Sequence, residues 1–372
     1  MISRTIIPWC PQDIRDSAYV NIPRGSQIIR IEGSISYDVY YYGDYRGDKY
    51  KYDWDHPDLA DNIWINEDEI PDNEIDDDNT EGSWNGTIEC PYQYIQDGID
   101  LADDGATVYV YSGTYVEELH ISKPVILQGE NKETTIISGN SIGIFADGVK
   151  ISGFTIKNSI SIYSDDNIIS DNIFISADFD DIRLDGSLNN KILDNSFSSN
   201  GITIRTSGTP FFKFYNTHTI QNNYINGKPI YYYKNNHQGC VVPSDASQVI
   251  LVNCSNFTIE NLNLANSFYG IQLYYSSHNN IMKNTINNGE RYGDGIYLFN
   301  SRYNQISENK LSYYHAGISI YKRSNWNVGQ KGNYWDDYTG IDSNSDGIGD
   351  TPYPILEDGN IDNYPLINPI GI

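Results

Sequence analysis

The sequence predicts an all-β solenoid, in which short strands wind into a coiled ribbon. Pairs of Ile, Leu or Val recur along the chain, for example at Ile271/Leu273, Ile296/Leu298 and Ile318/Ile320. Equivalent positions lie about 22 to 25 residues apart, which is the period of one solenoid repeat. Clusters of Asn, Ser and Gly separate the pairs and end each strand in a turn. Because one repeat cannot bury its apolar face alone, we expect roughly eight to ten stacked coils.

An asparagine recurs at one place in these repeats. It stands two residues before an apolar strand residue, as in Asn284-x-Ile286 and Asn309-x-Leu311. A residue that repeats in successive coils lines up with its counterparts in the stack. We therefore expect a structural role, because Asn tolerates turn geometries and bonds the backbone or the next Asn. These asparagines are Asn172, Asn195, Asn223, Asn284 and Asn309.

Three segments carry a family resemblance: Gly270-Ile-Gln-Leu-Tyr274, Gly295-Ile-Tyr-Leu-Phe299 and Gly332-Asn-Tyr-Trp-Asp-Asp-Tyr338. They are similar to the repeats of NosD-like and pectin-lyase-like surface proteins, and the resemblance covers about residues 75 to 369. It implies a right-handed parallel β-helix, but no single activity, because such folds host many. Leucine-rich repeats have a similar period, but their L-x-x-L-x-L-x-x-N frame is missing.

We expect three regions along the chain. Residues 1–75 lack the repeat but alternate at period two, which predicts a small β module or extension. Residues 76–330 form the β-helix, and residues 331–372 form its C-terminal cap. Within residues 92–103 the apolar side chains share one helical face, so a short helix is expected to cap the first coil and cover its edge.

Composition limits the partners and the location. The formal net charge is -26 and the pI is about 4.3, so no nucleic acid is expected, since phosphate would be repelled. No apolar run reaches about 18 residues, so no transmembrane segment is expected. Residues 1–11 lack the pattern of a signal peptide. The acidic solenoid indicates an extracellular or cell-surface protein, with the periplasm as the alternative location.

Four cysteines allow two disulfides. Cys240 with Cys254 and Cys10 with Cys90 is one of three connectivities, and free buried thiols are the alternative.

The strand that follows each turn predicts which side chains point outward. Its first and third residues are apolar and face the core, so its second and fourth face solvent. Neighbouring parallel strands lie about 4.8 Å apart, so the outward residues form columns along which a polysaccharide or cell-surface glycan could lie, flanked by an insertion at residues 226–248. The alternative is an ordinary exposed sheet face. The predicted carbohydrate-binding residues are Tyr163, Arg205, Tyr274, Tyr297, Phe299 and Tyr321.

A second hypothesis is a polysaccharide lyase, epimerase or glycoside hydrolase. Sugar hydrolysis or uronate elimination requires carboxylates near arginine, and the candidates are Asp181, Arg183, Asp185 and Arg205. However, the Asn-Thr-Asp and Gly-His-Gly segments of polygalacturonases and the Arg-x-Pro segment of pectate lyases are missing. A third hypothesis, copper handling in the periplasm, follows from the NosD resemblance. Copper needs soft or imidazole ligands, and the six His and two Met residues form no cluster in the sequence.

One local motif has the residue types of a calcium loop. Oxygen-bearing side chains alternate, and a glycine permits the tight bend that wraps a hard cation such as Ca²⁺. Tyr353 stands where an EF-hand has its bidentate Glu, so the motif resembles other Asp-rich surface calcium loops; a plain turn is the alternative. The predicted ligands are Asp342, Asn344, Asp346, Ile348 and Asp350. Taken together, we expect a non-catalytic secreted or cell-surface β-helix protein that binds carbohydrate or builds the cell surface, stabilised by structural calcium.

Overall fold

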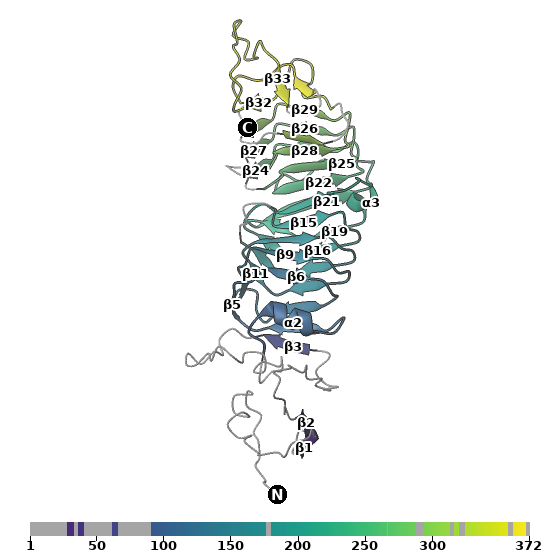
Figure 1. Cartoon of the computed structure of the whole chain (residues 1–372). Coiled ribbons are helices and arrows are strands. Elements are labelled where there is room, and N and C mark those ends of the chain that lie inside the picture. Colours follow the sequence, from purple (N-terminus) through teal and green to yellow (C-terminus); the bar gives the residue numbers. More distant parts are fainter. Residues whose placement is uncertain are drawn as a thin grey trace, which may run out of the picture.

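The protein is a parallel β-helix of about nine turns, and the predicted fold class is confirmed. The coils stack into a long column, with α2 (Ile95–Leu101) near one end and β33 (Tyr353–Ile355) at the other (Figure 1). The computed structural model describes residues 91–369 except 176–179, 266, 288–292, 313–315, 320–323 and 356–359, and the backbone of three earlier strands.

Three parallel sheets form the N-terminal stack. The first sheet contains β3 (Asn62–Ile65), β4 (Thr107–Val110), β7 (Ile126–Gly129), β10 (Lys150–Ser152), β13 (Ile168–Ser170), β16 (Lys191–Leu193) and β19 (Thr219–Gln221). The second contains β5 (Gly113–Tyr115), β8 (Thr135–Ile137), β11 (Thr155–Ile156), β14 (Ile173–Phe174), β17 (Ser196–Phe197) and β20 (Tyr224–Ile225). The third, hereafter the groove sheet, contains β6 (Leu119–Ile121), β9 (Ser141–Ile144), β12 (Ser159–Ile162), β15 (Ile182–Asp185) and β18 (Ile202–Arg205).

The C-terminal stack repeats this arrangement after the turn helix α3 (Lys213–Asn216). Its junction sheet contains β21 (Lys228–Lys234), β22 (Gln248–Val252), β25 (Ile271–Tyr274), β28 (Ile296–Phe299) and β31 (Ala316–Ser319). Its other sheets contain β23 (Thr258–Glu260), β26 (Asn280–Met282) and β29 (Gln305–Ser307), and β24 (Asn263–Ala265), β27 (Thr285–Asn287), β30 (Lys310–Ser312) and β32 (Tyr334–Trp335). Two antiparallel pairs lie outside the stacks: β1 (Ile28–Glu32) with β2 (Ser36–Tyr40), and β33 with β34 (Asn360–Asp362).

Strand β21 joins the two stacks. It pairs antiparallel with β20 and parallel with β22, so the second sheet of the N-terminal stack continues into the junction sheet. We expected residues 226–248 to be an insertion flanking a binding face. That expectation is wrong for residues 228–234, because they form a strand that pairs on both edges, with Ile230 buried and Tyr231, Tyr232 and Tyr233 half-buried.

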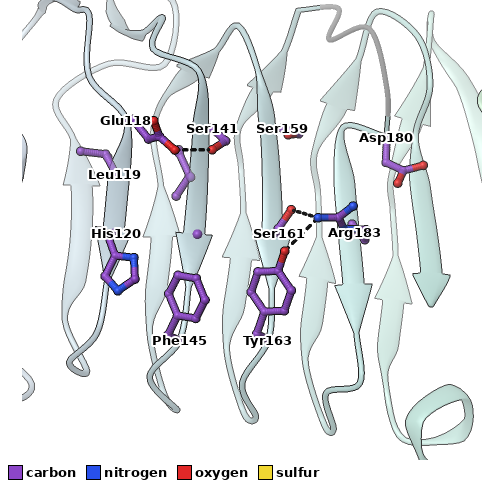
Figure 2. A pocket seen from close by; sticks show the side chains of 12 residues that line it. Glu118, Leu119, His120, Ser141, Phe145, Ser159, Ser161, Tyr163, Asp180 and Arg183 are labelled. Carbon is purple, nitrogen blue, oxygen red and sulfur yellow. Dashed lines mark hydrogen bonds between the residues drawn. The ribbon is translucent and has the colours of Figure 1, made fainter. Parts of the chain in front are cut away.

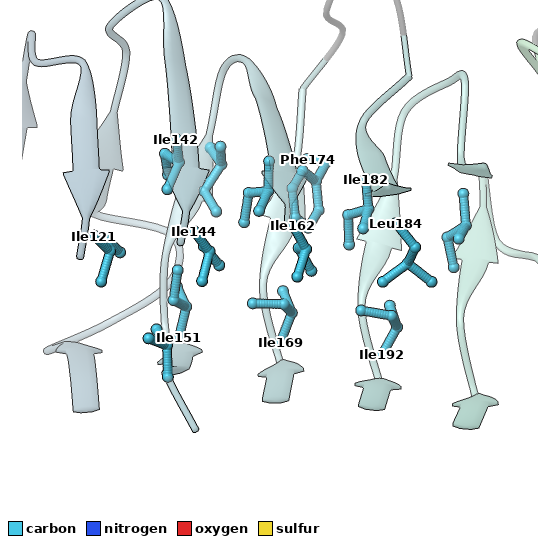
Figure 3. Close-up of a cluster of buried hydrophobic side chains, with 14 of the residues drawn as sticks. Ile121, Ile142, Ile144, Ile151, Ile162, Ile169, Phe174, Ile182, Leu184 and Ile192 are labelled. Carbon is cyan, nitrogen blue, oxygen red and sulfur yellow. The ribbon is translucent and has the colours of Figure 1, made fainter. Parts of the chain in front are cut away.

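Two separate hydrophobic cores result. The first core fills the N-terminal stack with Ile, Leu and Phe side chains from its three sheets, and Figure 3 shows them pointing inward from successive coils. The second core fills the C-terminal stack. The junction sheet lies between them: Ile250 and Val252 face the first core, while Val249 and Leu251 face the second. All five residues of β22 are therefore buried.

Side chains of the junction sheet also close the edge of the groove sheet. Strand β18 is the last strand of that sheet, so its outer backbone groups have no next strand. Gln248 Oε1 accepts a hydrogen bond from Ile202 N at 3.1 Å, and Gln272 Nε2 donates to Ile202 O at 2.8 Å. The hydroxyl of Tyr274 holds Gln272 in place by donating to its Oε1 at 2.7 Å. The outer backbone groups of Ile202 are thus satisfied without a further coil.

The recurrent asparagines form buried ladders, and their expected structural role is confirmed. Asn195 Oδ1 accepts from the backbone and side-chain nitrogens of Asn172, and Asn223 Oδ1 does the same for Asn195. Asn284 and Asn309 repeat the pattern in the C-terminal stack. Each ladder residue also donates to a backbone carbonyl of a neighbouring coil, for example from Asn195 Nδ2 to Ile169 O at 2.9 Å.

The predicted cap helix is present but shorter than residues 92–103. It spans Ile95–Leu101, and Ile95 and Ile99 are buried at the end of the first core. Glu117 fixes its start, because its carboxylate accepts from Ile95 N at 2.8 Å and Gln96 N at 3.0 Å. This contact supplies the cap that the sequence around residue 92 does not provide.

Two further expectations concern the cysteines and residues 1–75. Cys240 and Cys254 are free thiols, so a disulfide between them is wrong, while Cys10 and Cys90 lie outside the described residues. Strand β3 comes from residues 1–75 and pairs in parallel with β4, so it extends the first sheet of the β-helix.

Candidate functional site

The outer face of the groove sheet carries the clearest candidate site. His120, Gly143, Ser161, Arg183 and Thr203 stand opposite one another in neighbouring strands, at the positions that point away from the core. Ser161, Arg183 and Thr203 therefore form one column in register, in which Thr203 is fully buried. The structure extends it by two coils toward the N-terminus.

An open groove of about 460 Å³ runs across this face. Figure 2 shows His120, Phe145 and Tyr163 in a row along one side, with Glu118, Ser141 and Ser159 along the other. One side is therefore aromatic, and the other carries hydroxyl and carboxyl groups. The complete lining is Glu118, Leu119, His120, Ser141, Ile142, Gly143, Phe145, Ser159, Ser161, Tyr163, Asp180 and Arg183.

The aromatic side is a stacked row of three rings. The ring centroids of His120 and Phe145 are 4.3 Å apart, and those of Phe145 and Tyr163 are 5.0 Å apart. Gly143 makes room for the middle ring, because a Cβ atom there would lie 2.6 Å from the ring of Phe145. Phe145 and Tyr163 remain 47% and 41% exposed, so the row presents an apolar surface to the groove.

Arg183 links the aromatic side to the floor. Its Nη2 donates to Ser161 Oγ at 3.0 Å and to Tyr163 Oη at 2.9 Å (Figure 2). These bonds fix the guanidinium against the ring of Tyr163. Such a group offers further donors in a rigid plane to whatever occupies the groove.

A charged corner closes one end of the groove. Asp180 is only 3% exposed, and burial raises the pKa of its carboxyl, although Arg205 and the hydroxyl of Thr203 act in the opposite direction. Arg205 Nη2 lies 3.6 Å from Asp180 Oδ1 and donates to Tyr269 Oη at 3.0 Å. A carboxyl with a raised pKa beside a cation is able to exchange protons. Arg205 here also joins the two stacks.

Two of the four catalytic candidates are engaged in structural contacts. Asp181 is fully buried, and its Oδ2 accepts from Gly201 N at 3.0 Å. Both carboxylate oxygens of Asp185 accept from Ser207, one from its backbone N at 2.8 Å and one from its hydroxyl at 2.7 Å. These two acids stabilise loops, whereas Arg183 lines the groove and Arg205 contacts the lining residue Asp180.

The expected exposed aromatic row is wrong for two of its members. Tyr274 is fully buried and Phe299 is 4% exposed, and both rings stack on Tyr215, at 4.8 and 4.9 Å. The physical reason is that their side of the junction sheet faces the first core. Tyr163 is exposed, and Tyr297 is half-buried against Tyr269, with ring centroids 4.7 Å apart.

The register at the last strand also differs from expectation. Tyr321 was expected beside Phe299, but Ser319 stands opposite Phe299 because β31 begins at Ala316. The pairing is therefore displaced by two residues, and Tyr321 itself lies outside the described residues.

Sequence reasoning missed several groove residues, among them Glu118, His120 and Phe145. A signal for these three was available, since the segments ending at Ile121 and Ile144 have the same alternation as later strands, and extending the columns upstream reaches them. Asp180 precedes β15 by two residues, and no periodic signal marks it.

The loop expected to bind calcium is folded by its own carboxylates. Asp342 accepts from Asp346 N at 3.1 Å through Oδ1 and from Gly347 N at 2.9 Å through Oδ2. Asp350 Oδ2 accepts from Ser343 N at 3.0 Å, and hydrogen bonds from Ser343 lower the pKa of Asp350.

The residues of this loop fit a hard cation in type. Carboxylate, amide and backbone oxygens are available from Asp342, Asn344, Asp346, Ile348 and Asp350, with Gly347 at φ +87° making the bend. In the described part of the chain, this loop included, no group of three or more His, Cys, Asp or Glu side chains is arranged to hold a metal.

Comparisons with known proteins agree with the fold. Residues 135–334 match the family described as the right handed beta helix region. A curated relative, the "Probable ABC transporter binding protein NosD" of Stutzerimonas stutzeri, is 26% identical over 122 residues, which is 23% of this chain and 28% of the relative. This chain thus matches under a third of that protein's length.

Two solved structures are similar to part of the chain. Geobacillus virus E2 ORF18 is 14% identical, with a TM-score of 0.28 over 64% of this chain and 51% of its own. The A-module of Azotobacter vinelandii mannuronan C-5 epimerase AlgE6 is 13% identical, with a TM-score of 0.28 over 61% of this chain and 91% of its own.

Among the described residues, no helix is long and apolar enough to cross a membrane. Because the family match spans more than half of the sequence, the chain belongs to the right-handed β-helix region family.

Proposed function

We propose that the protein is a non-catalytic β-helix protein. It binds carbohydrate in the open groove on the outer face of the groove sheet. The supporting observation is the pairing of the exposed row Phe145 and Tyr163 with hydroxyl and carboxyl groups across the groove. A sugar ring has an apolar C–H face and a polar hydroxyl edge, so it fits a site with one aromatic and one polar side. Equivalent strands of successive coils extend the site along the column, and a site of this shape suits a polymer.

The non-catalytic assignment is supported by how the acids are bound. Glycoside hydrolysis commonly requires two carboxyls flanking the scissile bond. Asp181 and Asp185 instead accept hydrogen bonds from Gly201 and Ser207, and Asp180 is paired with Arg205. A lyase, epimerase or hydrolase centred on Asp180, Arg183 and Arg205 is the second candidate, supported by the raised pKa of Asp180.

Location and calcium complete the proposal. An extracellular or cell-surface position suits a net charge of -26 and a polysaccharide ligand, and the periplasm is the alternative because NosD is named as a transporter binding protein. Calcium at Asp342–Asp350 would be structural. Periplasmic copper handling, the remaining alternative, receives no support from a cluster of imidazole or thiolate ligands within the described residues.

The test is polysaccharide binding by the full chain and by groove variants. We expect the wild type to retard in affinity gels that contain one or more members of a broad polysaccharide panel. Phe145→Ala and Tyr163→Ala each lose about tenfold in affinity, since an aromatic contact contributes roughly 1 kcal/mol or more. Tyr224→Ala is the control, because Tyr224 is 39% exposed and lies outside the groove.

Three results would change the proposal. No binding to any polysaccharide removes it. Binding that survives both groove substitutions moves the site elsewhere. New reducing ends or unsaturated uronates in the panel, lost on Arg205→Ala, establish the catalytic alternative instead.

A further inference from the structure

A second hollow lies at the ends of the junction-sheet strands. It has a volume of about 390 Å³ and is open to solvent along one side. Asn253, Tyr275 and Asn300, which directly follow β22, β25 and β28, form part of it. The complete lining is Phe212, Asn253, Tyr275, Ser277, Asn300 and Arg302.

One wall of the hollow is an aromatic loop that is held in place. Tyr275 Oη donates to Pro210 O at 2.8 Å, and the rings of Phe212 and Tyr275 meet edge to face at 5.1 Å. The loop is also fixed to the groove sheet by the two Ser207 to Asp185 hydrogen bonds. Phe212 nevertheless remains 37% exposed, so a fixed ring faces solvent at the mouth of the hollow. An exposed ring in a fixed position is available for contact with a ligand.

The floor of the hollow is polar and neutral. Asn253 lines the hollow, and its Nδ2 donates to Asn235 Oδ1 at 2.7 Å. Asn300 adds a second amide and Ser277 a hydroxyl. These groups are donors and acceptors suited to sugar hydroxyls.

The rim is positively charged in an otherwise acidic protein. Arg302 lies over the ring of Tyr303 at 5.6 Å, and none of the six lining residues is a carboxylate. The whole chain has 50 acidic and 24 basic residues, so a hollow with one cation and no acid is an exception. Its charge complements an anionic group.

We propose that this hollow is a second carbohydrate subsite, which takes a sugar unit bearing a carboxylate or sulfate group. The ring of Phe212 covers the apolar sugar face, the amides and Ser277 bind hydroxyls, and Arg302 pairs with the anionic substituent. The inference rests on the proposed function for its general ligand class. It adds a specific site and a charge requirement.

The position of the hollow relative to the groove supports one polymer bound at both. Phe145 and Tyr163 directly follow β9 and β12, just as Asn253 and Tyr275 follow β22 and β25. The loop that leaves the end of β18 reaches Tyr275, so the hollow lies further along the same edge of the column. A long chain that occupies both sites binds more tightly than two separate units, because the second contact is intramolecular.

The experiment compares matched charged and neutral polymers. The full chain is titrated with polygalacturonate and its carboxyl-reduced form, and with dextran sulfate and dextran. We expect wild type to bind the charged member of at least one pair about tenfold more tightly, as one charge-assisted hydrogen bond allows. Arg302→Gln erases that ratio, and Phe212→Ser weakens both members of the pair. Lys157→Gln, which removes one exposed positive charge elsewhere, retains the wild-type ratio.

The outcomes separate this inference from the proposed function. Equal binding of charged and neutral members by wild type, or an unchanged ratio in Arg302→Gln, overturns the second subsite while leaving the groove intact. Tyr163→Ala should lower the affinity for both members of a pair and keep the ratio of the two affinities. Loss of binding in the groove is therefore distinguishable from loss of the second subsite. No binding to any of the four polymers overturns the inference, and the broader panel then decides the proposed function. The pair in which Arg302→Gln acts identifies the anionic group as carboxylate or sulfate.

Discussion

At the scale of residues, neighbouring coils are joined by polar side chains in the interior. A buried amide stabilises the fold only when its donors and acceptors are satisfied, and the asparagine ladders achieve this by repetition. One ladder ends in a histidine: Asn167 N donates to Asn190 Oδ1, and Asn190 N donates to His218 Nδ1 at 3.3 Å. His218 Nε2 in turn donates to Phe214 O at 2.9 Å. Because Nδ1 accepts a hydrogen bond, this arrangement requires the neutral ring.

His218 makes the stability depend on pH. Burial lowers the pKa of His218 from 6.5 to about 4. Because the folded-state pKa lies below the unfolded value, its contribution is complete above about pH 6.5 and is lost as the pH falls toward about 4. We expect a loss of about 3 kcal/mol across this window, measured by urea denaturation. His218→Asn should remove that part of the pH dependence.

The exposed His278 supplies the control for this measurement. His278→Asn should keep the wild-type pH profile. An equally steep loss in His218→Asn and wild type would assign the acid sensitivity to other groups.

The role of a residue could be predicted from the sequence where its position recurs in successive coils. The asparagines at Asn195 and Asn309 were assigned correctly, because equivalence across coils already implies contact between them. The burial of Tyr274 could not be predicted from the sequence of its own strand. Whether an outward ring meets water or another core depends on the packing between stacks, which no local period encodes.

At the scale of elements, β22 illustrates what a strand pattern can indicate. Val249 to Val252 is an uninterrupted apolar run, whereas other strands alternate apolar and polar residues. Such a run is typical of a parallel strand that is buried on both faces. The apolar run in β22 therefore indicated that this strand lies between two cores. Tyr231 and Tyr233 of β21 obscured this signal, because tyrosine suits half-exposed strands as well as buried ones.

The Asp342–Asp350 loop is the element for which metal removal gives a prediction. We expect the melting temperature of the full chain to be a few degrees higher in millimolar CaCl2 than in EDTA, since a ligand that binds only the folded state stabilises it. Asp342→Asn should abolish this difference by removing a carboxylate from the loop. The measurement is differential scanning calorimetry.

The exposed Asp104 provides the matched substitution at the far end of the column. Asp104→Asn should respond to calcium as wild type does. Identical melting in CaCl2 and EDTA would leave the loop as an ordinary Asp-rich turn.

At the scale of the whole molecule, the column is two packed bodies that share one sheet. Ile250 and Leu251 are adjacent in sequence, yet their side chains belong to the first and the second core respectively. The repeat predicted one continuous core because each coil follows the last in sequence. The structure instead interrupts it at β21, where a hairpin reverses the chain before the next coil.

This arrangement predicts different effects for two neighbouring substitutions. Ile250→Ala and Leu251→Ala should each destabilise by about 2 to 5 kcal/mol, because each leaves a cavity in a core. Hydrogen exchange measured by mass spectrometry should rise mainly around β15 and β18 for Ile250→Ala, and mainly around β26 and β29 for Leu251→Ala. The same exchange pattern in both variants would mean that the two bodies unfold as one unit.

The glutamines at the junction have a consequence for assembly. An open strand at the end of a solenoid is a template on which a second molecule can continue the sheet. Gln248 and Gln272 place side-chain amides against the backbone of Ile202, where the peptide groups of such a molecule would bind. The junction thus protects against polymerisation from within the chain, in a region far from both of its termini.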